Sequence, residues 1–545
     1  MTTKDKFSKY LLTLSFLVCL FFFTGFKKKS HKKKIKKYPN IVLIVSDDLG
    51  YGDLGAYSVD NKIHTPNIDK LAASGVRFTD AHSATSLCSP SRYAILTGRY
   101  PWRTRLKRGV VASWGKPLIN KGRITLATLL KKRGYYTAGV GKWHLGFNWP
   151  LKPGKRILPK QVWSEKVVSK VNWQGTLSGG PLNHGFDYYY GIPGSINMIP
   201  YVIIEDHRVT EAPIAKKTYY DSDWHHALRA PNWSTKMMGA KMTEKAVSII
   251  DEHFTHHKDQ PLFLYFPTTS IHRPDVPNFT QGWSKAGLRG DMVAQFDWTV
   301  GQIIQALKRK GQLNNTLLII TSDNGPHPGD PVPWLEKLQA RGNGYKMLPK
   351  GYLSGKYYPT DAIHRPDYGP WMTYGHKAAG DLTGFKSDPW EGGHRIPFIV
   401  YWPDKIKEPR VDKNMLCLSD LLATFADITH QKLPKNAGED SDDMLPEFLG
   451  KNKQPIRNIM VNAGGWDEFT LRYGKWDLIN VKKYAHNDTQ YPSKIGNGPE
   501  LYNLKTDVEE KHNVIGQHPE LVKKMRALLH KYQEQGYSAN RLEKK

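Results

Sequence analysis

Short apolar runs alternate with longer amphipathic segments over most of the chain. The apolar runs are residues 38–46, 261–266, 315–321 and 398–401. Runs of this length bounded by polar residues are typical of strands buried on both faces of a parallel sheet. Between and around them, helices are predicted at residues 65–72, 124–132, 242–253, 291–310 and 418–429. The pattern predicts an α/β fold with a large mixed, mostly parallel sheet flanked by helices.

The pattern changes at about residue 434. Short strands with hairpin spacing are predicted at residues 456–461, 468–473, 475–480 and 500–504. Residues 519–535 form an amphipathic helix whose apolar face carries Leu521, Met525, Leu528, Leu529 and Tyr532. We therefore expect a main domain at residues 38–430 and a subdomain at 431–545, which has a smaller antiparallel sheet plus a helix.

The first 37 residues have the character of a targeting segment. Lys4, Lys6 and Lys9 precede an apolar run at residues 11–26, which is short for a membrane span. Residues 1–26 are therefore predicted to be a signal peptide, and export to the periplasm, the exterior or the membrane surface is expected. An uncleaved anchor that tethers the protein to a membrane is the alternative, because the lysine-rich run at 27–37 tends to stay cytoplasmic. That run is predicted to be a solvated linker.

Charge and cysteine content narrow the classes of partner. The formal net charge is +29, and eleven lysines and one acid at residues 4–37 account for +10, which leaves +19 on the rest. A basic body favours anionic partners, but no nucleic-acid-binding module is recognisable, so no nucleic acid is expected. Of the three cysteines, Cys19 lies in the leader and Cys417 has no evident partner, so no disulfide framework is predicted.

The remaining cysteine, Cys88, opens the motif C-S-P-S-R at residues 88–92, which continues to T-G at 97–98. Pro90 favours a turn, and a helix can continue from Tyr93. A residue at such a helix start lies near free backbone N–H groups, which suit an anion, and Arg92 faces the same point one turn later. The motif predicts a reactive side chain beside an anion site. The alternative is a buried structural cysteine beside a surface arginine.

Two adjacent acids, Asp47 and Asp48, follow the first apolar run. The carboxyl end of a parallel strand is where open α/β sheets place their ligands. Adjacent carboxylates repel each other unless a cation joins them. A cation site is therefore predicted, and a solvated turn is the alternative.

These segments resemble the signatures of the type I, formylglycine-dependent sulfatases of the alkaline phosphatase superfamily. The resemblance covers most of the chain from Pro39 onward. Besides C-S-P-S-R, it rests on D-D at residues 47–48, G-K-W-H at 141–144, D-N-G at 323–325 and K-S-D-P-W-E-G-G-H-R at 386–395. The main domain is then the catalytic domain, and the H-G-F-D-Y segment at 184–188 is assigned a structural role.

The resemblance implies a cofactor and a metal. Cys88 would be converted to formylglycine by a maturation enzyme, and its hydrated aldehyde would be the nucleophile. One divalent cation would be bound by Asp47, Asp48, residue 88, Asp323 and Asn324. An all-oxygen set suits Ca²⁺, with Mg²⁺ possible, and argues against zinc.

The resemblance also implies roles for polar side chains. Arg92, Lys142 and Lys386 would surround the sulfate group and offset its charge. His144 would hydrogen-bond the formylglycine hydroxyl, and His272 or Lys386 would protonate the departing alcohol. His253, His256 and His257 lie on a polar helix end and are expected to face solvent.

The implied reaction is hydrolysis of a sulfate monoester with release of inorganic sulfate. A sulfated polysaccharide or oligosaccharide is the expected substrate, because the body is basic and residues 149–183 and 327–381 are rich in Trp, Tyr, Gly and Arg. The alternatives are a phosphonate monoester or phosphodiester hydrolase of the same superfamily, and a non-catalytic glycan-binding protein if Cys88 is not matured. The sequence leaves the oligomeric state open.

Overall fold

The computed structural model describes residues 38–214, 228–273, 277–327, 374–466, 468–481 and 498–543. The predicted leader at 1–26 and linker at 27–37 lie outside the described residues, as does most of the segment 327–381. Residues 39–545 form one compact unit. The described part of the chain contains no helix whose length and hydropathy would let it cross a bilayer.

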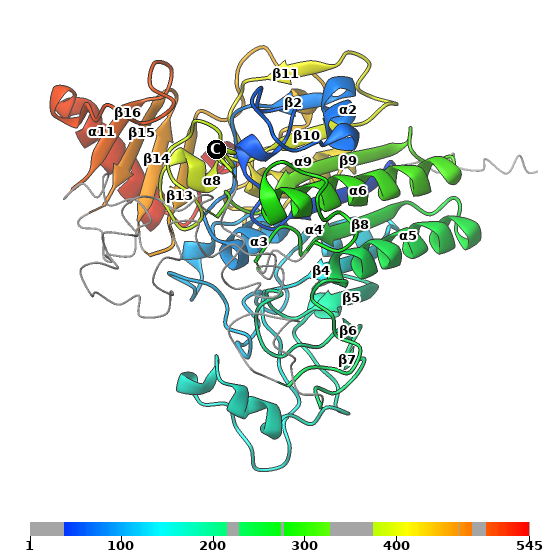
Figure 1. Cartoon of the computed structure of the whole chain (residues 1–545). Coiled ribbons are helices and arrows are strands. Elements are labelled where there is room, and N and C mark those ends of the chain that lie inside the picture. Colours follow the sequence, from blue (N-terminus) through cyan, green and yellow to red (C-terminus); the bar gives the residue numbers. More distant parts are fainter. Residues whose placement is uncertain are drawn as a thin grey trace, which may run out of the picture. The chain divides into compact units, whose positions relative to one another are not determined.

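A ten-stranded mixed sheet runs through the main domain in the order β11-β2-β10-β9-β1-β8-β4-β5-β6-β7 (Figure 1). Its strands are β1 (Asn40–Ser46), β2 (Val76–Phe78), β4 (Tyr136–Lys142), β5 (Tyr188–Ile192), β6 (Ile204–Glu205), β7 (Arg208–Val209), β8 (Leu262–Pro267), β9 (Thr316–Ser322), β10 (Phe398–Tyr401) and β11 (Arg410–Asp412). The five central strands β9, β1, β8, β4 and β5 are parallel to one another. The predicted fold class is confirmed.

The apolar run in β1 is buried at every one of its seven positions because β8 and β9 pair with it on both sides. Each buried Val, Leu or Ile side chain contributes about 1.5–3 kcal/mol relative to an exposed one. The centre of the sheet is therefore the main hydrophobic core.

Helices cover both faces of this sheet. The helices of the described residues, some of which lie against the C-terminal sheet instead, are α2 (Pro66–Ser74), α3 (Cys88–Thr97), α4 (Leu126–Lys131), α5 (Met238–His256), α6 (Gly287–Arg309), α8 (Glu391–His394), α9 (Leu421–Ile428), α10 (Leu445–Phe448), α11 (Pro519–Glu534) and α12 (Asn540–Glu543). Short 3₁₀ turns lie at Tyr51–Asp53, Pro101–Arg103, Pro159–Gln161, Glu165–Lys170, Pro181–His184, Leu418–Asp420 and Ile515–Gln517.

Strand register shows which helices lie on which face. Tyr136 of β4 stacks on His253 of α5, whereas Phe263 of β8, which pairs with the next residue Thr137, contacts Phe425 of α9. Successive residues of a strand point to opposite faces. Hence α5 and α9 cover opposite faces, and α6 packs beside α5 (Figure 1).

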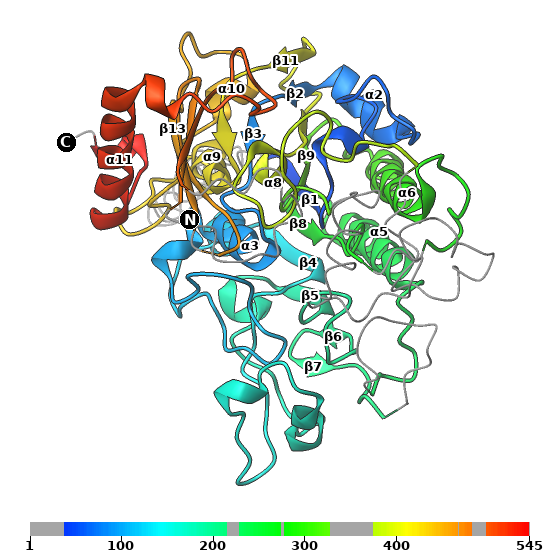
Figure 2. The same ribbon diagram turned by 60° about the vertical axis from the view of Figure 1, so that its left-hand side comes forward.

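A separate four-stranded antiparallel sheet follows in the C-terminal part. It has the order β13 (Ile459–Ala463), β14 (Phe469–Tyr473), β15 (Trp476–Asn480) and β16 (Glu500–Asn503). Helix α11 packs on β14 and β15 through its predicted apolar face (Figure 2). Two very short strands, β3 (Ala81–His82) and β12 (Leu416–Cys417), pair in parallel. The boundary at residue 430 stays a prediction.

Candidate active site

Four predicted site residues lie at the carboxyl ends of neighbouring parallel strands. Asp47 follows β1, Lys142 ends β4, His272 follows β8 and Asp323 follows β9. Because these strands are parallel and adjacent, their ends meet at one edge of the sheet, where ligands bind in open α/β folds. Residues separated by up to 276 positions thereby come into contact.

Cys88 is the first residue of α3, so the helix begins earlier than the predicted start at Tyr93. Pro90 lies within the first turn, where a missing N–H costs nothing. The thiol is 2% exposed, and its Sγ lies 3.3 Å from His144 Nδ1. The neighbouring Ser89 hydroxyl donates to the His144 carbonyl at 2.8 Å, so the two motifs are joined directly.

Arg92 is fully buried, which excludes the surface arginine of the alternative interpretation. Its Nε and Nη2 lie 2.8 and 2.7 Å from Asp323 Oδ2, and its Nη1 donates to the Lys142 carbonyl at 2.9 Å. A buried guanidinium needs such pairing because desolvation of a lone charge costs several kcal/mol. Arg92 thereby fixes the end of β9 against the end of β4.

Each lysine of the predicted sulfate site contacts one of the paired acids. Lys142 Nζ lies 2.6 Å from Asp47 Oδ2, and Lys386 Nζ lies 2.7 Å from Asp48. Burial raises the pKa of both carboxyls, but Lys142 next to Asp47 and Lys386 next to Asp48 hold each pKa below its ordinary value. Both acids are therefore ionised and able to bind a cation.

The carboxylates and the amide fit a divalent cation. Asp47 Oδ1 and Asn324 Oδ1 are buried without a hydrogen-bond partner. Ligand atoms of Asp47, Cys88 and Asp323 lie within 4.8 Å of one another, and Asn324 Nδ2 donates to Asp48 Oδ1 at 2.7 Å. Orphaned buried oxygens beside ionised acids favour a hard, oxygen-binding ion such as Ca²⁺ or Mg²⁺.

Two further residues at this site were missed by the sequence analysis. His327 Nε2 lies 3.1 Å from Asp48 Oδ2, beside His272, whose Nε2 is 3.8 Å from the same oxygen. Arg273 Nη2 in turn lies 3.1 Å from His327 Nδ1. The only available signal was position, because His327 follows D-N-G-P and Arg273 follows His272. Burial lowers the pKa of His272 to about 3, and nearby Lys386 adds to this effect.

The glycines of the E-G-G motif have a packing role. A Cβ on Gly325 would lie 2.0 Å from the Gly392 carbonyl oxygen, and one on Gly393 would lie 2.2 Å from that of Asp388. The Gly325 N–H donates to the Gly393 carbonyl at 2.8 Å. Only glycine permits this approach, so the motif places α8 directly under the loop that carries Asn324.

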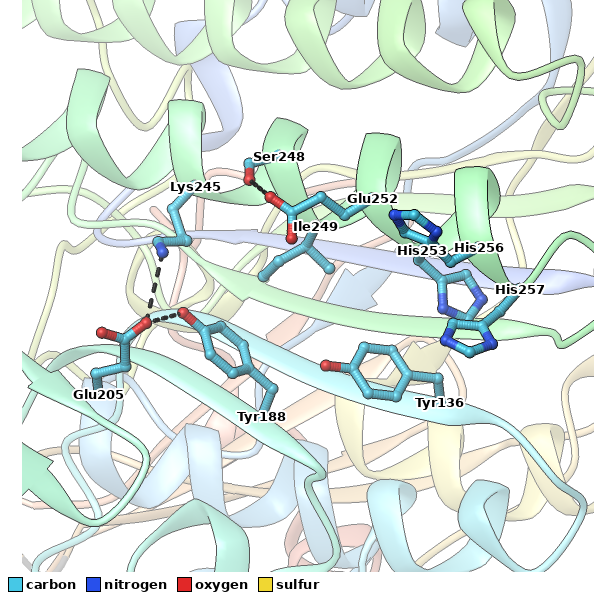
Figure 3. Close-up of a pocket in the computed structure, with 10 residues that line it drawn as sticks. All are labelled: Tyr136, Tyr188, Glu205, Lys245, Ser248, Ile249, Glu252, His253, His256 and His257. Atoms are coloured by element: carbon cyan, nitrogen blue, oxygen red, sulfur yellow. Dashed lines mark hydrogen bonds and ion pairs between the residues drawn. The ribbon is translucent and has the colours of Figure 1, made fainter.

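The prediction that His253 faces solvent is wrong, because the residue is buried and only 4% exposed. Its ring stacks on Tyr136, and its Nε2 lies 2.9 Å from the Gln260 carbonyl oxygen. His256 and His257 are exposed as predicted. All three line a pocket of about 390 Å³ between α5 and the strands β4, β5 and β6 (Figure 3). None of the predicted site residues lines it.

The aromatic insertion at 149–183 also differs from expectation. Trp149 is 7% exposed and packs against Trp114 and Trp173, with ring centroids 4.9 and 6.0 Å away. Trp114 and Trp149 are buried and Trp173 is half-buried, so these rings pack mainly against one another. Trp163, at 49% exposure, is the accessible tryptophan of this segment.

Comparisons with known proteins agree with this geometry. A family described as Sulfatase matches residues 39–431. The chain is 31% identical over 547 residues to an N-acetylgalactosamine-6-O-sulfatase of Bacteroides thetaiotaomicron, covering 93% of this chain and 96% of that one. It is 29% identical to arylsulfatase A of Bos taurus, covering 88% and 83%.

A solved structure from glycosaminoglycan metabolism in Bacteroides thetaiotaomicron superposes with a TM-score of 0.72 at 29% identity. The superposition covers 91% of this chain and 99% of that one. The protein described here belongs to the sulfatase family. It is a sulfuric ester hydrolase, as predicted.

Proposed function

We propose that the protein removes sulfate from a sulfated polysaccharide or oligosaccharide, with Cys88 matured to formylglycine and one Ca²⁺ ion bound beside it. The observation that carries the proposal is the ring of buried cations around Cys88. Arg92, Lys142 and Lys386 all converge on the acids next to its Sγ. Burial raises the pKa of the thiol, so an unmodified cysteine is a weak nucleophile here.

The chain's own residues supply electrostatic stabilisation of a sulfate group. A sulfate ester repels an anionic nucleophile, and preorganised cations offset that charge in a site without water. Asp47, Asp48, Asp323 and Asn324 would hold a divalent ion, which would supply Lewis-acid polarisation of the sulfate group. Matured residue 88 would supply a hydrated aldehyde, whose second hydroxyl would allow sulfate to be expelled.

Proton transfer to the leaving alcohol is assigned to Lys386 or His272. Burial lowers the pKa of Lys386, but Asp48 raises it above its ordinary value. The lowered pKa of His272 would have to rise when the sulfate group binds. Both side chains approach Asp48 Oδ2, at 3.8 and 2.7 Å, so they face the same region from β8 and from the loop before α8. His144, 3.3 Å from Cys88 Sγ, is placed to accept or donate a hydrogen bond at the nucleophile. A positioned acid or base contributes about 10²–10⁴-fold to a rate.

The carbohydrate assignment is supported by an exposed tryptophan beside the site. Trp466 is 44% exposed and follows Gly465, whose N–H donates to the Ser387 carbonyl at 2.9 Å. A Cβ on Gly465 would lie 3.3 Å from Leu87 Cδ1. The turn between β13 and β14 therefore lies between the residue before Cys88 and the residue after Lys386. An exposed indole at that place suits a sugar ring.

The relatives point the same way, since one is a sulfatase of an N-acetylgalactosamine 6-O-sulfate. Export and a possible membrane tether are proposed from the leader, and a maturation enzyme is required for formylglycine at residue 88. Phosphonate monoester or phosphodiester hydrolysis, and glycan binding without turnover, remain the alternatives.

The test is kcat/KM at fixed, stated salt for sulfated mono- and oligosaccharides, aryl sulfates, phosphodiesters and phosphonates. The protein is co-expressed with a maturation enzyme, and peptide mass spectrometry reports residue 88. The proposal is supported if a sulfated sugar has the highest kcat/KM of these substrates. Faster turnover of a phosphodiester or phosphonate than of any sulfate ester would favour the phosphonate monoester or phosphodiester hydrolase alternative. Equal rates on sulfated sugars and aryl sulfates would contradict the carbohydrate assignment.

A further inference from the structure

A buried pair of histidines lies outside the catalytic cluster. His82 is the last residue of β3, a few residues before Cys88, and His394 is the last residue of α8, shortly after Lys386. Both are 0% exposed, and their Nδ1 atoms are 3.0 Å apart. The pair therefore joins the segment that carries the nucleophile to the segment that carries a sulfate-binding lysine.

Hydrogen-bond accounting shows that this pair needs an extra proton. His82 Nε2 lies 2.8 Å from Asp80 Oδ1, and His394 Nε2 lies 3.1 Å from the Pro389 carbonyl oxygen. Both partners are acceptors, so each Nε2 must carry a hydrogen. A neutral imidazole has only one N–H, so two neutral rings would point lone pairs at each other across 3.0 Å. One additional proton converts this clash into an N–H···N hydrogen bond.

Charged groups lie beside the pair and around the two acids that contact it. They are Asp80 before β3, Glu391 and Arg395 at α8, Arg472 on β14, Asp477 on β15 and Glu510 after β16. Burial raises the pKa of Asp80, but Arg472 and Arg395 hold it well below its usual value. Arg472 likewise lowers the pKa of Glu391 to about 2 against burial. Two anions beside the rings therefore stabilise a buried imidazolium.

Which ring holds the proton follows from these neighbours. His82 bonds to ionised Asp80 and lies 3.9 Å from Glu391 Oε1. Burial, and then the charge of His82, lower the pKa of His394 to about 3. His82 is the donor and His394 the neutral acceptor.

A metal ion is the competing occupant, because both Nδ1 atoms and a Glu391 oxygen lie within 4.8 Å of one another. Two observations disfavour it. Arg472 and Arg395 already donate to the Glu391 carboxylate at 3.1 and 2.9 Å, and they would repel a dication. Nitrogens bound to a tetrahedral zinc at about 2.0–2.1 Å lie about 3.3–3.4 Å apart, farther than a hydrogen-bonded pair.

We propose that His82 and His394 share one proton at neutral pH and act as positioning residues for Lys386 and Asn324. The mechanical link is backbone pairing. The Ser83 N–H donates to the His394 carbonyl at 2.8 Å, and Gly393, next to His394, accepts from Gly325 at 2.8 Å. This inference depends on sulfate ester hydrolysis and not on a carbohydrate substrate, so an aryl sulfate serves as the assay.

The proton makes stability depend on pH in a defined direction. Above the ordinary histidine pKa of about 6.5, the unfolded chain releases a proton that the folded pair keeps. The folded state then binds more protons, so the free energy of unfolding falls as pH rises. Above neutrality, the pair is expected to contribute one proton per molecule to the slope of the free energy of unfolding against pH. Burial raises the pKa of Asp477 well above its usual value, so the slope of a variant is compared with that of the wild type, and its absolute value is not interpreted.

The deciding variant is His82→Asn, which removes the ring that carries the proton and whose amide can donate to His394 Nδ1 without an extra proton. Free energies of unfolding are measured in urea from about pH 7 to about pH 9.5. The variant should lose one proton from the wild-type slope. The matched control, His253→Asn, removes a buried histidine that also bonds a backbone carbonyl and should keep the wild-type slope. An unchanged slope in His82→Asn overturns the shared proton.

Positioning is tested with His394→Leu, which leaves His82 Nδ1 without an acceptor. On an aryl sulfate at pH 7, kcat should fall about tenfold with a smaller change in KM, and His394→Asn should restore most of it. If the Leu variant does not fold, kcat–pH profiles decide. Wild-type kcat should fall at alkaline pH as the pair loses its proton, and His82→Asn should not show this fall. Wild-type kcat in the Leu variant, or one equivalent of transition metal lost from His394→Asn in elemental analysis, would contradict the proposal.

Discussion

The surroundings of the two buried cysteines differ in charge and not in burial. Cys88 is 2% exposed and Cys417 is 0% exposed. Around Cys88 lie His144, two lysines and two acids, whereas Cys417 packs in a mainly apolar cluster with Ala84, Tyr100 and Met460. A buried ion pair, Asp420 with Arg457, lies near Cys417. Burial raises the pKa of Cys417 to about 11. Burial is therefore common to both cysteines, and the adjacent histidine and the larger set of converging charges distinguish the one with the proposed chemical role.

The largest expected effect separates these two cysteines directly. Cys88→Ala should reduce sulfate release to background, because the proposed nucleophile is lost while a small side chain keeps α3 intact. Cys417→Ser should keep wild-type kcat and lose only stability, since it places a hydroxyl in an apolar core. Full activity in Cys88→Ala, or in wild-type protein whose Cys88 thiol is unmodified, would contradict the proposed nucleophile.

The next effect compares two buried acids that each pair with an arginine, one beside Cys88 and one outside the predicted cation site. Asp323→Asn should abolish Ca²⁺ binding and destabilise the fold by about 3–5 kcal/mol, because Arg92 loses its closest carboxylate and keeps only Asp47 Oδ1 at 3.7 Å. Asp440→Asn, which removes a buried acid paired with Arg103 at 2.8 Å, should destabilise the fold without changing Ca²⁺ binding. Calorimetric titration of metal-free protein with Ca²⁺ and Mg²⁺ measures cation binding by each variant, and urea unfolding measures its stability. Undiminished Ca²⁺ binding in Asp323→Asn would show that Asp323 is not a ligand of the cation.

A smaller effect is expected from the histidine at the end of β8. His272→Ala should lower kcat by about 10²–10⁴-fold with less change in KM, because proton transfer acts in the transition state. Buried His253 in the α5 pocket provides the contrast, and His253→Ala should keep wild-type kcat. Steady-state kinetics on one sulfate ester decide the point. A near wild-type kcat for His272→Ala would leave Lys386 as the proton donor.

The smallest effect tests the contribution of the C-terminal sheet. Trp466→Ala should raise KM for a sulfated oligosaccharide, since a stacked ring contributes about 0.5–1.5 kcal/mol, and leave an aryl sulfate unaffected. Trp163→Ala, which removes the comparably exposed tryptophan of the insertion, should change neither KM. The reverse result would place the sugar against the insertion.

The sequence alone determined most elements and the class of the protein. Apolar runs such as 38–46 and 315–321 became β1 and β9, because strands buried on both faces leave a strong local signal. The fold class, the sulfatase family and the esterase activity are confirmed. The motif positions were also available from sequence, although the roles of their residues stay predictions.

Tertiary structure decided what local patterns do not encode. The start of α3 at Cys88, the burial of His253 against Tyr136 and the mutual packing of Trp149 and Trp114 depend on distant partners. The same holds for His327, which lies at Asp48 only because β1 and β9 are neighbours. The proton that we assign to His82 and His394 follows from two ring nitrogens 312 positions apart in the chain. Sequence records which groups are present, and the pairing of parallel strands decides which of them meet.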